Sequence, residues 1–334
     1  MNRTKENFSI PDVAGLGSNA TDIVVRLPYF PTPDSKVELL SAERKAGGQV
    51  ASALVACSRW GLRARYMGKI GDDAAGNFQR KEMEREKVEA QWIPAPGCTS
   101  QSSFILVDQR SGERTVLWKR DAGIAVRPED LQREWISGVR ALLVDGHDTK
   151  ASAQVARWAH EENIPVVGDF DNRYAGVKEL LEVTDFPITS KDFPERFTGE
   201  ADLLKSLPII FRDSGCRLII ATMGRLGALA WDGEQFLLCP GFRVEAVDTT
   251  GAGDIFHGAF LYALVHGWEV EVKDALEFCC AAAALNCKAL GARGGIATLD
   301  EIESLRRKGE RSELAYKPEV LLEAARVQTG GAGP

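Results

Sequence analysis

The sequence predicts an α/β fold: a doubly wound, mostly parallel β-sheet with helices on both faces, and a small antiparallel sheet beside it. Short apolar runs that suit buried strands alternate along the chain with longer runs at helical spacing. Two stretches, near residues 23–40 and 102–120, carry β-branched runs with no helical pattern between them. A chain of 334 residues suits one large α/β domain of this kind with an appendage.

The expected elements follow in order along the chain. Strands are expected at residues 13–18, 64–69, 141–145, 165–169 and 217–223, and an alternating run at 242–247 also suits a strand. Helices are expected at residues 50–60, 75–87, 152–162, 202–214 and 255–264. The main domain is expected to span residues 10–325, with segments 23–45 and 99–120 forming the small sheet, and disordered tails at 1–9 and 326–334.

Composition narrows the class of protein. A net charge of −7 argues against nucleic acid or an anionic membrane as the main partner. The first residues carry no signal-peptide core, and no apolar run is long enough to span a membrane. The seven cysteines have no disulfide-framework spacing, and Cys279-Cys280 in an alanine-rich helical stretch predicts buried free thiols. We therefore expect a cytoplasmic protein.

The most informative stretch runs from Asp248 to Gly258 (DTTGAGDIFHG), where a glycine-rich turn opens a helix. The first N–H groups of a helix have no partner within it, so such a turn is suited to binding an anion. A carboxylate at Asp254 would repel that anion unless it has a chemical role. Its natural role is to take a proton from an attacking hydroxyl while the backbone at 251–253 holds a transferring phosphoryl group. The alternative is an acid that merely caps a tight turn.

Two motifs carry a resemblance to a known family. Asp248-Thr-Thr-Gly-Ala-Gly-Asp-Ile-Phe-His-Gly-Ala-Phe260 is similar to the C-terminal signature of the ribokinase-like (PfkB) carbohydrate kinases. Ala46-Gly-Gly-Gln-Val-Ala-Ser-Ala-Leu54 resembles their N-terminal di-glycine motif, and the likeness covers residues 13–299. The resemblance implies a sugar kinase that uses ATP and Mg²⁺, with Asp254 as general base and Gly251, Ala252 and Gly253 as anion hole. It also implies that the small sheet is a lid over the sugar and the contact of a homodimer.

Further site residues follow from the same resemblance. For the acceptor sugar they are Asp22, Gly47, Gly48, Gln49 and Arg114, where Gln49 replaces the usual asparagine. For the nucleotide they are Thr222, Gly224, Gly227, Ala283 and Asn286. Taken without the family, Asp22 is equally well explained as an exposed turn acid, and Arg114 as a solvated loop arginine.

Two pairs of oxygen-bearing residues are candidates for metal binding. Asp169 and Asp171, in a segment similar to the family's Asp-x-Asn-x-Arg, would hold Mg²⁺ through water, although a solvated charge cluster is the rival interpretation. Asp248 and Thr250 would offer oxygens to a monovalent cation such as K⁺. The family's Asn-x-x-Glu magnesium motif is absent, because Ser190 and Phe193 stand in its place.

The acceptor is expected to be a small sugar phosphorylated at a primary hydroxyl. The segments Thr99–Ser103 and Phe256–Gly258 resemble the ketohexokinase and sulfofructose kinase branches, which favours a ketose such as fructose. A sulfosugar ranks lower, since residues 146–148 are Gly-His-Asp and offer no arginine. A nucleoside kinase of the same fold and a noncatalytic sugar sensor remain alternatives.

Other nucleotide and hydrolase motifs are not supported. Residues 15–20 (GLGSNA) match a dinucleotide-binding pattern, but a β-branched run follows where that pattern requires a helix. The sequence contains neither a P-loop nor a Gly-x-Ser-x-Gly elbow.

Overall fold

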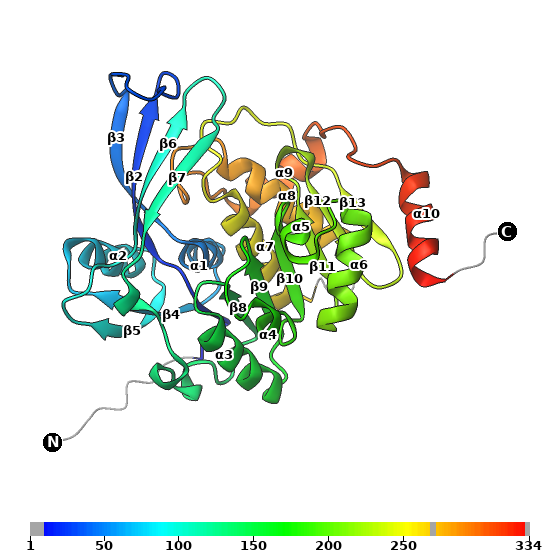
Figure 1. Ribbon diagram of the computed structural model, residues 1–334, viewed down its shortest axis with the longest axis horizontal. Coiled ribbons are helices and arrows are strands. Elements are labelled where there is room, and N and C mark those ends of the chain that lie inside the picture. The colour runs from blue at the N-terminus through cyan, green and yellow to red at the C-terminus, as the bar shows by residue number, and fades with distance from the viewer. Residues whose placement is uncertain (1–9, 268–271, 331–334) are drawn as a thin grey trace.

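A computed structural model describes residues 10–267 and 272–330, so the tail expected at 1–9 and the last four residues of the tail expected at 326–334 lie outside the described residues. The chain forms a large α/β body from which a small sheet projects at one end (Figure 1). The predicted fold class is confirmed.

The body is built on one mostly parallel sheet. Over the described residues it has nine strands in the order β13-β12-β11-β10-β9-β8-β1-β4-β5, and only the β11–β12 and β12–β13 pairs are antiparallel. Chain order runs outward in both directions from the β1–β8 pair, and an open α/β sheet binds its ligands at the carboxyl ends of the strands near such a switch point. The strands are β1 (Val13–Leu16), β4 (Ala64–Gly71), β5 (Glu89–Ala95), β8 (Ala141–Asp145), β9 (Val166–Phe170), β10 (Phe186–Ser190), β11 (Ile219–Thr222), β12 (Ala228–Trp231) and β13 (Phe236–Cys239).

Helices cover both faces of this sheet, and each face has its own apolar core. One core joins α1, α7 and α8 to the sheet, and the other joins α3 to α6. The central strands β1, β8 and β9 are buried along their whole length, as expected for parallel strands covered on both sides. The helices are α1 (Gln49–Arg59), α2 (Ala74–Arg85), α3 (Thr149–Glu161), α4 (Val177–Leu181), α5 (Phe193–Thr198), α6 (Leu203–Ser214), α7 (Ala252–Val265), α8 (Val272–Asn286), α9 (Leu299–Lys308) and α10 (Pro318–Thr329), with 3₁₀ turns at Ala122–Ile124, Pro128–Asp130, Arg133–Trp135 and Gly224–Leu226.

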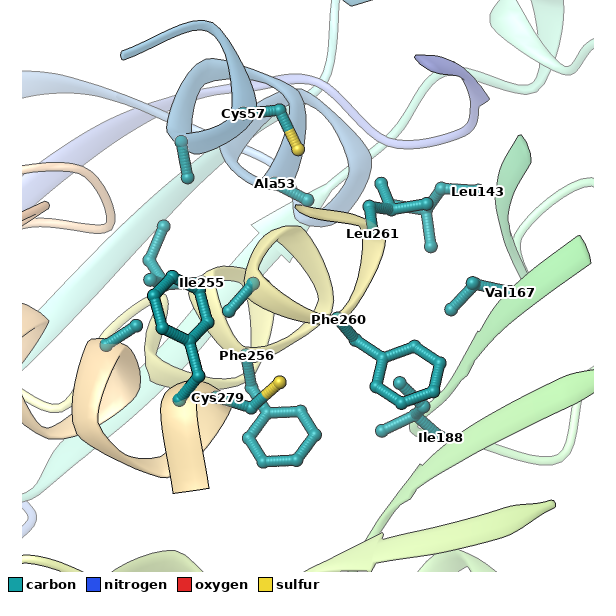
Figure 2. Close-up of a cluster of buried hydrophobic side chains, with 14 of the residues drawn as sticks. Ala53, Cys57, Leu143, Val167, Ile188, Ile255, Phe256, Phe260, Leu261 and Cys279 are labelled. Carbon is teal, nitrogen blue, oxygen red and sulfur yellow. The ribbon is translucent and has the colours of Figure 1, made fainter. Parts of the chain in front are cut away.

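Helix α7 lies in the middle of the first core. Its apolar side chains meet α1 on one side, α8 on another and strands β8 to β10 beyond (Figure 2). Gly258 allows the close approach of α1, because a Cβ there would lie 2.6 Å from the carbonyl oxygen of Ala53. The Cys57 thiol donates to the Gly258 carbonyl across the same contact, at 3.3 Å. The helix is therefore firmly held where its N-terminus reaches the strand ends.

The small sheet, which we call the lid, contains β3 (Ser41–Gly47), β2 (Ala20–Leu27), β6 (Ser102–Asp108) and β7 (Arg114–Lys119) in that order. The β2–β3 and β6–β7 pairs are antiparallel as predicted, whereas the two central strands run parallel. Asp22, Ser103 and Trp118 stand opposite one another on one face of the lid. The neighbouring residues Ile23, Phe104 and Leu117 form the corresponding row on the other face.

Some expected elements differ from the structure. The strand predicted at 242–247 does not form: only Phe242 pairs, in an isolated bridge with Arg311. The tail predicted to start at residue 326 is wrong for its first part, because α10 continues to Thr329 before Gly330 ends it in a left-handed conformation. None of the described helices combines the length and the apolar character needed to cross a lipid bilayer. All seven cysteines are free, and six are buried, including Cys279 and Cys280 as predicted.

Candidate active site

The glycine-rich turn predicted from the sequence opens α7. Gly251 is the N-cap with φ 76°, a conformation that favours glycine, and a Cβ there would lie 2.6 Å from Cα of Ala292. Ala252, Gly253 and Asp254 form the first turn, so their N–H groups have no intrahelical acceptor. Gly253 is exposed, with open space where a Cβ would point. The turn therefore presents backbone donors to solvent with little steric cover, as an anion hole requires.

Asp254 has an environment suited to a general base. Its carboxyl group is partly buried, and the loss of water around it raises its pKa from an ordinary 3.8 to about 6. The positive charge of Arg114 opposes this rise, and the carboxylate of Asp22 adds to it. A group with this pKa is mostly ionised at neutral pH and still basic enough to accept a proton.

A buried hydrogen-bond network shapes the turn that precedes α7. Asp248 is fully buried, and its Oδ1 accepts from the Thr250 N–H at 2.9 Å and from the Thr250 hydroxyl at 2.6 Å. Its Oδ2 accepts from the Gly291 N–H at 2.8 Å. The Asn286 amide donates to the carbonyls of Thr250, at 3.2 Å, and Ala292, at 3.1 Å. Asp248 and Asn286 thus tie the anion-hole turn to the loop after α8.

The predicted acceptor residues meet where the lid joins the body. Asp22 is buried, and Ser103 of the neighbouring strand donates to it. Burial raises the pKa of Asp22, while the Ser103 hydrogen bond and the charge of Arg293 counteract that rise. Gly47 leaves room for this carboxylate, because a Cβ there would collide with Asp22 Oδ2. Gly48 has φ 91°, so the di-glycine turn needs both glycines.

Gln49 begins α1 and reaches the end of a body strand. Its amide Nε2 donates to Oδ2 of Asp169 at 3.2 Å. Burial raises the pKa of Asp169 well above its ordinary value, and the nearby carboxylates of Asp171 and Asp254 add to this. Burial also raises the pKa of Asp171, whose Oδ1 is buried without a hydrogen-bond partner. The two acids predicted to bind a metal therefore lie close to one another, and Asp169 lies close enough to Asp254 for the two charges to interact.

Arg114 connects the lid to the anion-hole turn. Its Nη1 donates to the Thr249 hydroxyl at 2.8 Å. Gly112, at the lid's hairpin, sits against the same loop, because a Cβ there would lie 3.2 Å from the Ala246 carbonyl oxygen. The structure thus brings Arg114 from 135 residues away in sequence to the base of α7.

The residues predicted for the nucleotide are spread over the end of β11, the 3₁₀ turn that follows it and helix α8. Thr222 ends β11, and its hydroxyl donates to the Thr189 carbonyl at 3.1 Å. Gly224 (φ 59°) and Gly227 (φ 95°) are both in conformations that favour glycine. Ala283 is half-buried on α8. Asn286 is buried; its Nδ2 donates within the network described above, whereas its Oδ1 has no hydrogen-bond partner, so its nucleotide role stays a prediction.

Two buried polar residues escaped the sequence reasoning. Asn19 is 6% exposed, and neither its amide nitrogen nor its amide oxygen has a hydrogen-bond partner. One feature of the sequence could have identified Asn19 as a site residue: it lies in the turn before Asp22, within Gly-Ser-Asn-Ala-Thr-Asp. Arg293 is 6% exposed and donates to the Gly47 carbonyl at 2.7 Å and to the Ser52 hydroxyl at 3.1 Å. Burial lowers the pKa of this guanidinium to about 10, and no sequence pattern identified it.

An aromatic cluster at the strand ends also went unpredicted. The Trp118 ring of the lid meets His147 edge-on, with centroids 5.9 Å apart, and His147 lies 5.0 Å from the Tyr174 ring. Nδ1 of His147 lies 3.4 Å from Oδ2 of Asp145. Burial alone would lower the pKa of His147, but this carboxylate outweighs it and the pKa is raised. The Trp118–His147 pair is thus a contact between the lid and the body.

Comparison with known proteins agrees with this geometry. The sequence profile of the pfkB family of carbohydrate kinases matches residues 12–299.

The chain belongs to the pfkB family of carbohydrate kinases.

Relatives and solved structures of the family cover nearly the whole chain. The ribokinase of Bacillus subtilis is 27% identical over 303 residues, which is 88% of this chain and 99% of that protein. The deoxyribokinase of Salmonella typhi is 25% identical over 80% of this chain and 90% of its own. The crystal structure of a proposed ribokinase from Agrobacterium tumefaciens superposes with a TM-score of 0.83 at 28% identity, over 90% of this chain and 98% of that one. This pfkB-family protein is accordingly a sugar kinase, a phosphotransferase.

Proposed function

We propose that the protein transfers the γ-phosphoryl group of ATP to a primary hydroxyl of a small sugar. The observation that supports this most directly is the position of Asp254, a carboxyl group with a pKa of about 6 in the first turn of α7, beside backbone N–H groups that have no acceptor within the helix. Arg114 reaches this turn from the lid, and the charge of buried Asp22 acts on the same carboxyl. A base, an anion hole and a sugar-binding acid thus share one site.

The chemistry follows from these positions. The sugar lies under the lid, where Asp22 accepts hydrogen bonds from its hydroxyls and the Asn19 amide accepts or donates them, and its primary hydroxyl lies near Asp254. As that oxygen attacks phosphorus in line, Asp254 takes its proton. The backbone at 251–253 stabilises the negative charge on the transferring group. A positioned base contributes about 10²–10⁴-fold, and preorganised donors contribute a comparable factor.

ATP is the proposed donor because two relatives are named for it. These are an ATP-dependent ribose-1-phosphate kinase, 27% identical, and an ATP-dependent 6-phosphofructokinase, 25% identical. In our proposal the nucleotide side is lined by the residues predicted from the sequence: Thr222, Gly224, Gly227, Ala283 and Asn286.

Magnesium fits the acids next to the base. The unpartnered Oδ1 of Asp171 and the neighbouring Asp169 offer the oxygen ligands that Mg²⁺ prefers, directly or through water. The ion would neutralise charge on the phosphates of ATP. A monovalent cation at Asp248 and Thr250 stays a prediction, and dependence of the rate on K⁺ would test it. Here the carboxylate of Asp248 already accepts three hydrogen bonds.

The acceptor we favour is a ketose such as fructose. The resemblance of Thr99–Ser103 and Phe256–Gly258 to the ketohexokinase branch supports it, and Ser103 in this structure bonds directly to Asp22. Ribose is the second candidate, because the relatives described above are a ribokinase and a deoxyribokinase. We place a sulfosugar lower, since His147, at the position where an arginine would be wanted, is already paired with Asp145.

We also propose that two copies pair through their lids. The outer face of the lid exposes Phe104 and Leu117, 56% and 55% exposed, on neighbouring strands. A small sheet with one apolar face needs a cover, and a second lid supplies one. The molar mass in solution, compared with that of Leu117→Lys, tests this pairing.

The free thiols of all seven cysteines support a location in the reducing cytoplasm.

The deciding experiment is ADP release from ATP·Mg²⁺ with a panel of acceptors. The panel contains fructose, ribose, deoxyribose, 2-keto-3-deoxygluconate and adenosine, and Asp254→Asn serves as the control. Release that depends on a sugar and disappears in the variant is the expected result. Release with adenosine alone would make the protein a nucleoside kinase. Binding of sugar without any release would make it a sensor, and the proposed function would be wrong.

A further inference from the structure

His257 lies one turn along α7 from the peptide that joins Gly253 to Asp254. His257 is buried, with 4% of its surface exposed. Nδ1 of the ring lies 2.7 Å from the Gly253 carbonyl oxygen. Nε2 lies 3.5 Å from the Ile188 carbonyl oxygen and 3.6 Å from Oδ1 of Asp169.

The short contact fixes which nitrogen carries the proton. A carbonyl oxygen can only accept, so Nδ1 must be the donor toward Gly253. Nε2 faces the ends of β9 and β10, where the Ile188 carbonyl and Asp169 lie at the longer distances of 3.5 and 3.6 Å.

The carbonyl that His257 holds belongs to a catalytically important peptide. Because a peptide group is planar, the Gly253 C=O and the Asp254 N–H turn together. Glycines at 251 and 253 leave this backbone more freedom than other residues would. A second hydrogen bond to the Gly253 carbonyl, beyond that of the helix itself, therefore restricts both an N–H at the anion site and the Cα that carries the base.

We propose that His257 is a positioning residue for phosphoryl transfer, acting through Nδ1 on the Gly253–Asp254 peptide. The role rests on the proposed function, since it assigns His257 no contact with either substrate. It accounts for a buried imidazole in the first turns of an otherwise apolar helix face. A misplaced base costs far more in rate than in substrate binding, so the loss is expected in kcat.

Two amide substitutions distinguish the ring nitrogens. Asparagine at 257 places its amide nitrogen near the position of Nδ1, whereas the longer glutamine places it near Nε2. We expect His257→Gln and His257→Ala to lower kcat by about 10- to 100-fold, with KM values for ATP and sugar changed by less than about threefold. His257→Asn is expected to stay within about threefold of the wild type.

The chain contains a matched control on the same helix. Nδ1 of His266 makes the same contact, 2.7 Å from the Tyr262 carbonyl four residues earlier, but at the exposed C-terminal end of α7. His266→Gln and His266→Asn should both leave kcat unchanged. Equal losses of kcat in the Asn and Gln variants of His257, or wild-type kcat in His257→Ala, would overturn the proposal.

A measurement that needs no acceptor separates this inference from the proposed function. The ¹⁵N NMR spectrum of the histidine rings at pH 7 reports which nitrogen of His257 is protonated, with His257→Asn used to assign the resonance. Protonation at Nδ1 is expected. A ring protonated at Nε2 alone would contradict the proposed hydrogen bond from Nδ1 to the Gly253 carbonyl. If no acceptor in the panel is phosphorylated, the proposed function fails, while this spectrum still tests the contact.

Discussion

Replacing Asp254 by asparagine should abolish activity and yet stabilise the folded protein. As the proposed base, Asp254 contributes about 10²–10⁴-fold to the rate, and an amide cannot accept the proton. The effect on stability has the opposite sign. The pKa of Asp254 is raised from 3.8 to about 6. Ionising this carboxyl group therefore costs more free energy in the folded chain than in the unfolded chain.

The size of that cost can be worked out. A difference of one pH unit between the folded and unfolded pKa corresponds to about 1.4 kcal/mol, so the full difference would be about 3 kcal/mol at neutral pH. Because the carboxyl is partly exposed, solvent screening reduces this, and we expect about 1 kcal/mol. The folded state gains stability as pH falls from 6 toward 4, where the native carboxyl is protonated. The advantage of the variant should therefore be full above pH 6 and shrink toward pH 4.

The assay compares thermal unfolding of wild type and variant at pH 8 and pH 5, alongside ADP release and ATP binding. About 1 kcal/mol corresponds to roughly 1–2 °C in a chain of this size. Asp300, an exposed acid in the first turn of α9, is the matched control, and Asp300→Asn should not raise Tm. Wild-type turnover by Asp254→Asn, or a lower Tm than wild type at pH 8, would refute the reasoning.

Three more outcomes are expected. The value of kcat/KM should fall about twofold at pH 6 and about tenfold at pH 5, because protonated Asp254 cannot act as base; a flat profile to pH 5 would exclude it. Gly251→Ala should lower the free energy of unfolding by more than about 1 kcal/mol, since φ is 76° and the Cβ collides with Ala292. Gly253→Ala, with open space at its Cβ, should not lower it, and denaturant unfolding of the two variants measures the difference. Asn286→Ala should cost about 1–3 kcal/mol and reduce kcat, because two buried carbonyls lose their donor; unchanged unfolding would contradict the network.

The parts of the fold that could be predicted are those with a strong local pattern. The apolar strands around β1, β8 and β9 and the helical spacing after Ile255 needed only residue periodicity. The strand expected at 242–247 failed because alternation does not show whether a neighbouring strand is available, and here only Phe242 finds a partner. The short antiparallel strands β12 and β13 have four residues each and were not predicted from so little sequence.

The same distinction between local pattern and distant partners applies to the residues of the candidate site. Asp254 and the glycines around it could be predicted because anion-hole chemistry needs those residue types at that spacing. Arg293 could not, since its partners, Gly47 and Ser52, lie more than two hundred residues away. The sequence also gives no information on how the amide of Asn286 is used: its Nδ2 donates within a buried network, while its Oδ1 has no partner.

The gathering of acids is the property that unites the site. Asp22 comes from the lid, Asp169 from β9 and Asp254 from α7, and burial raises the pKa of each. Carboxylates placed so close destabilise the ligand-free protein at neutral pH, so stability does not explain their arrangement. A sugar supplies hydroxyl donors, and Mg²⁺ supplies positive charge, so both would relieve the repulsion when they bind. The charge distribution is therefore better matched to the occupied site than to the empty one, which is the expected signature of a binding site for these ligands.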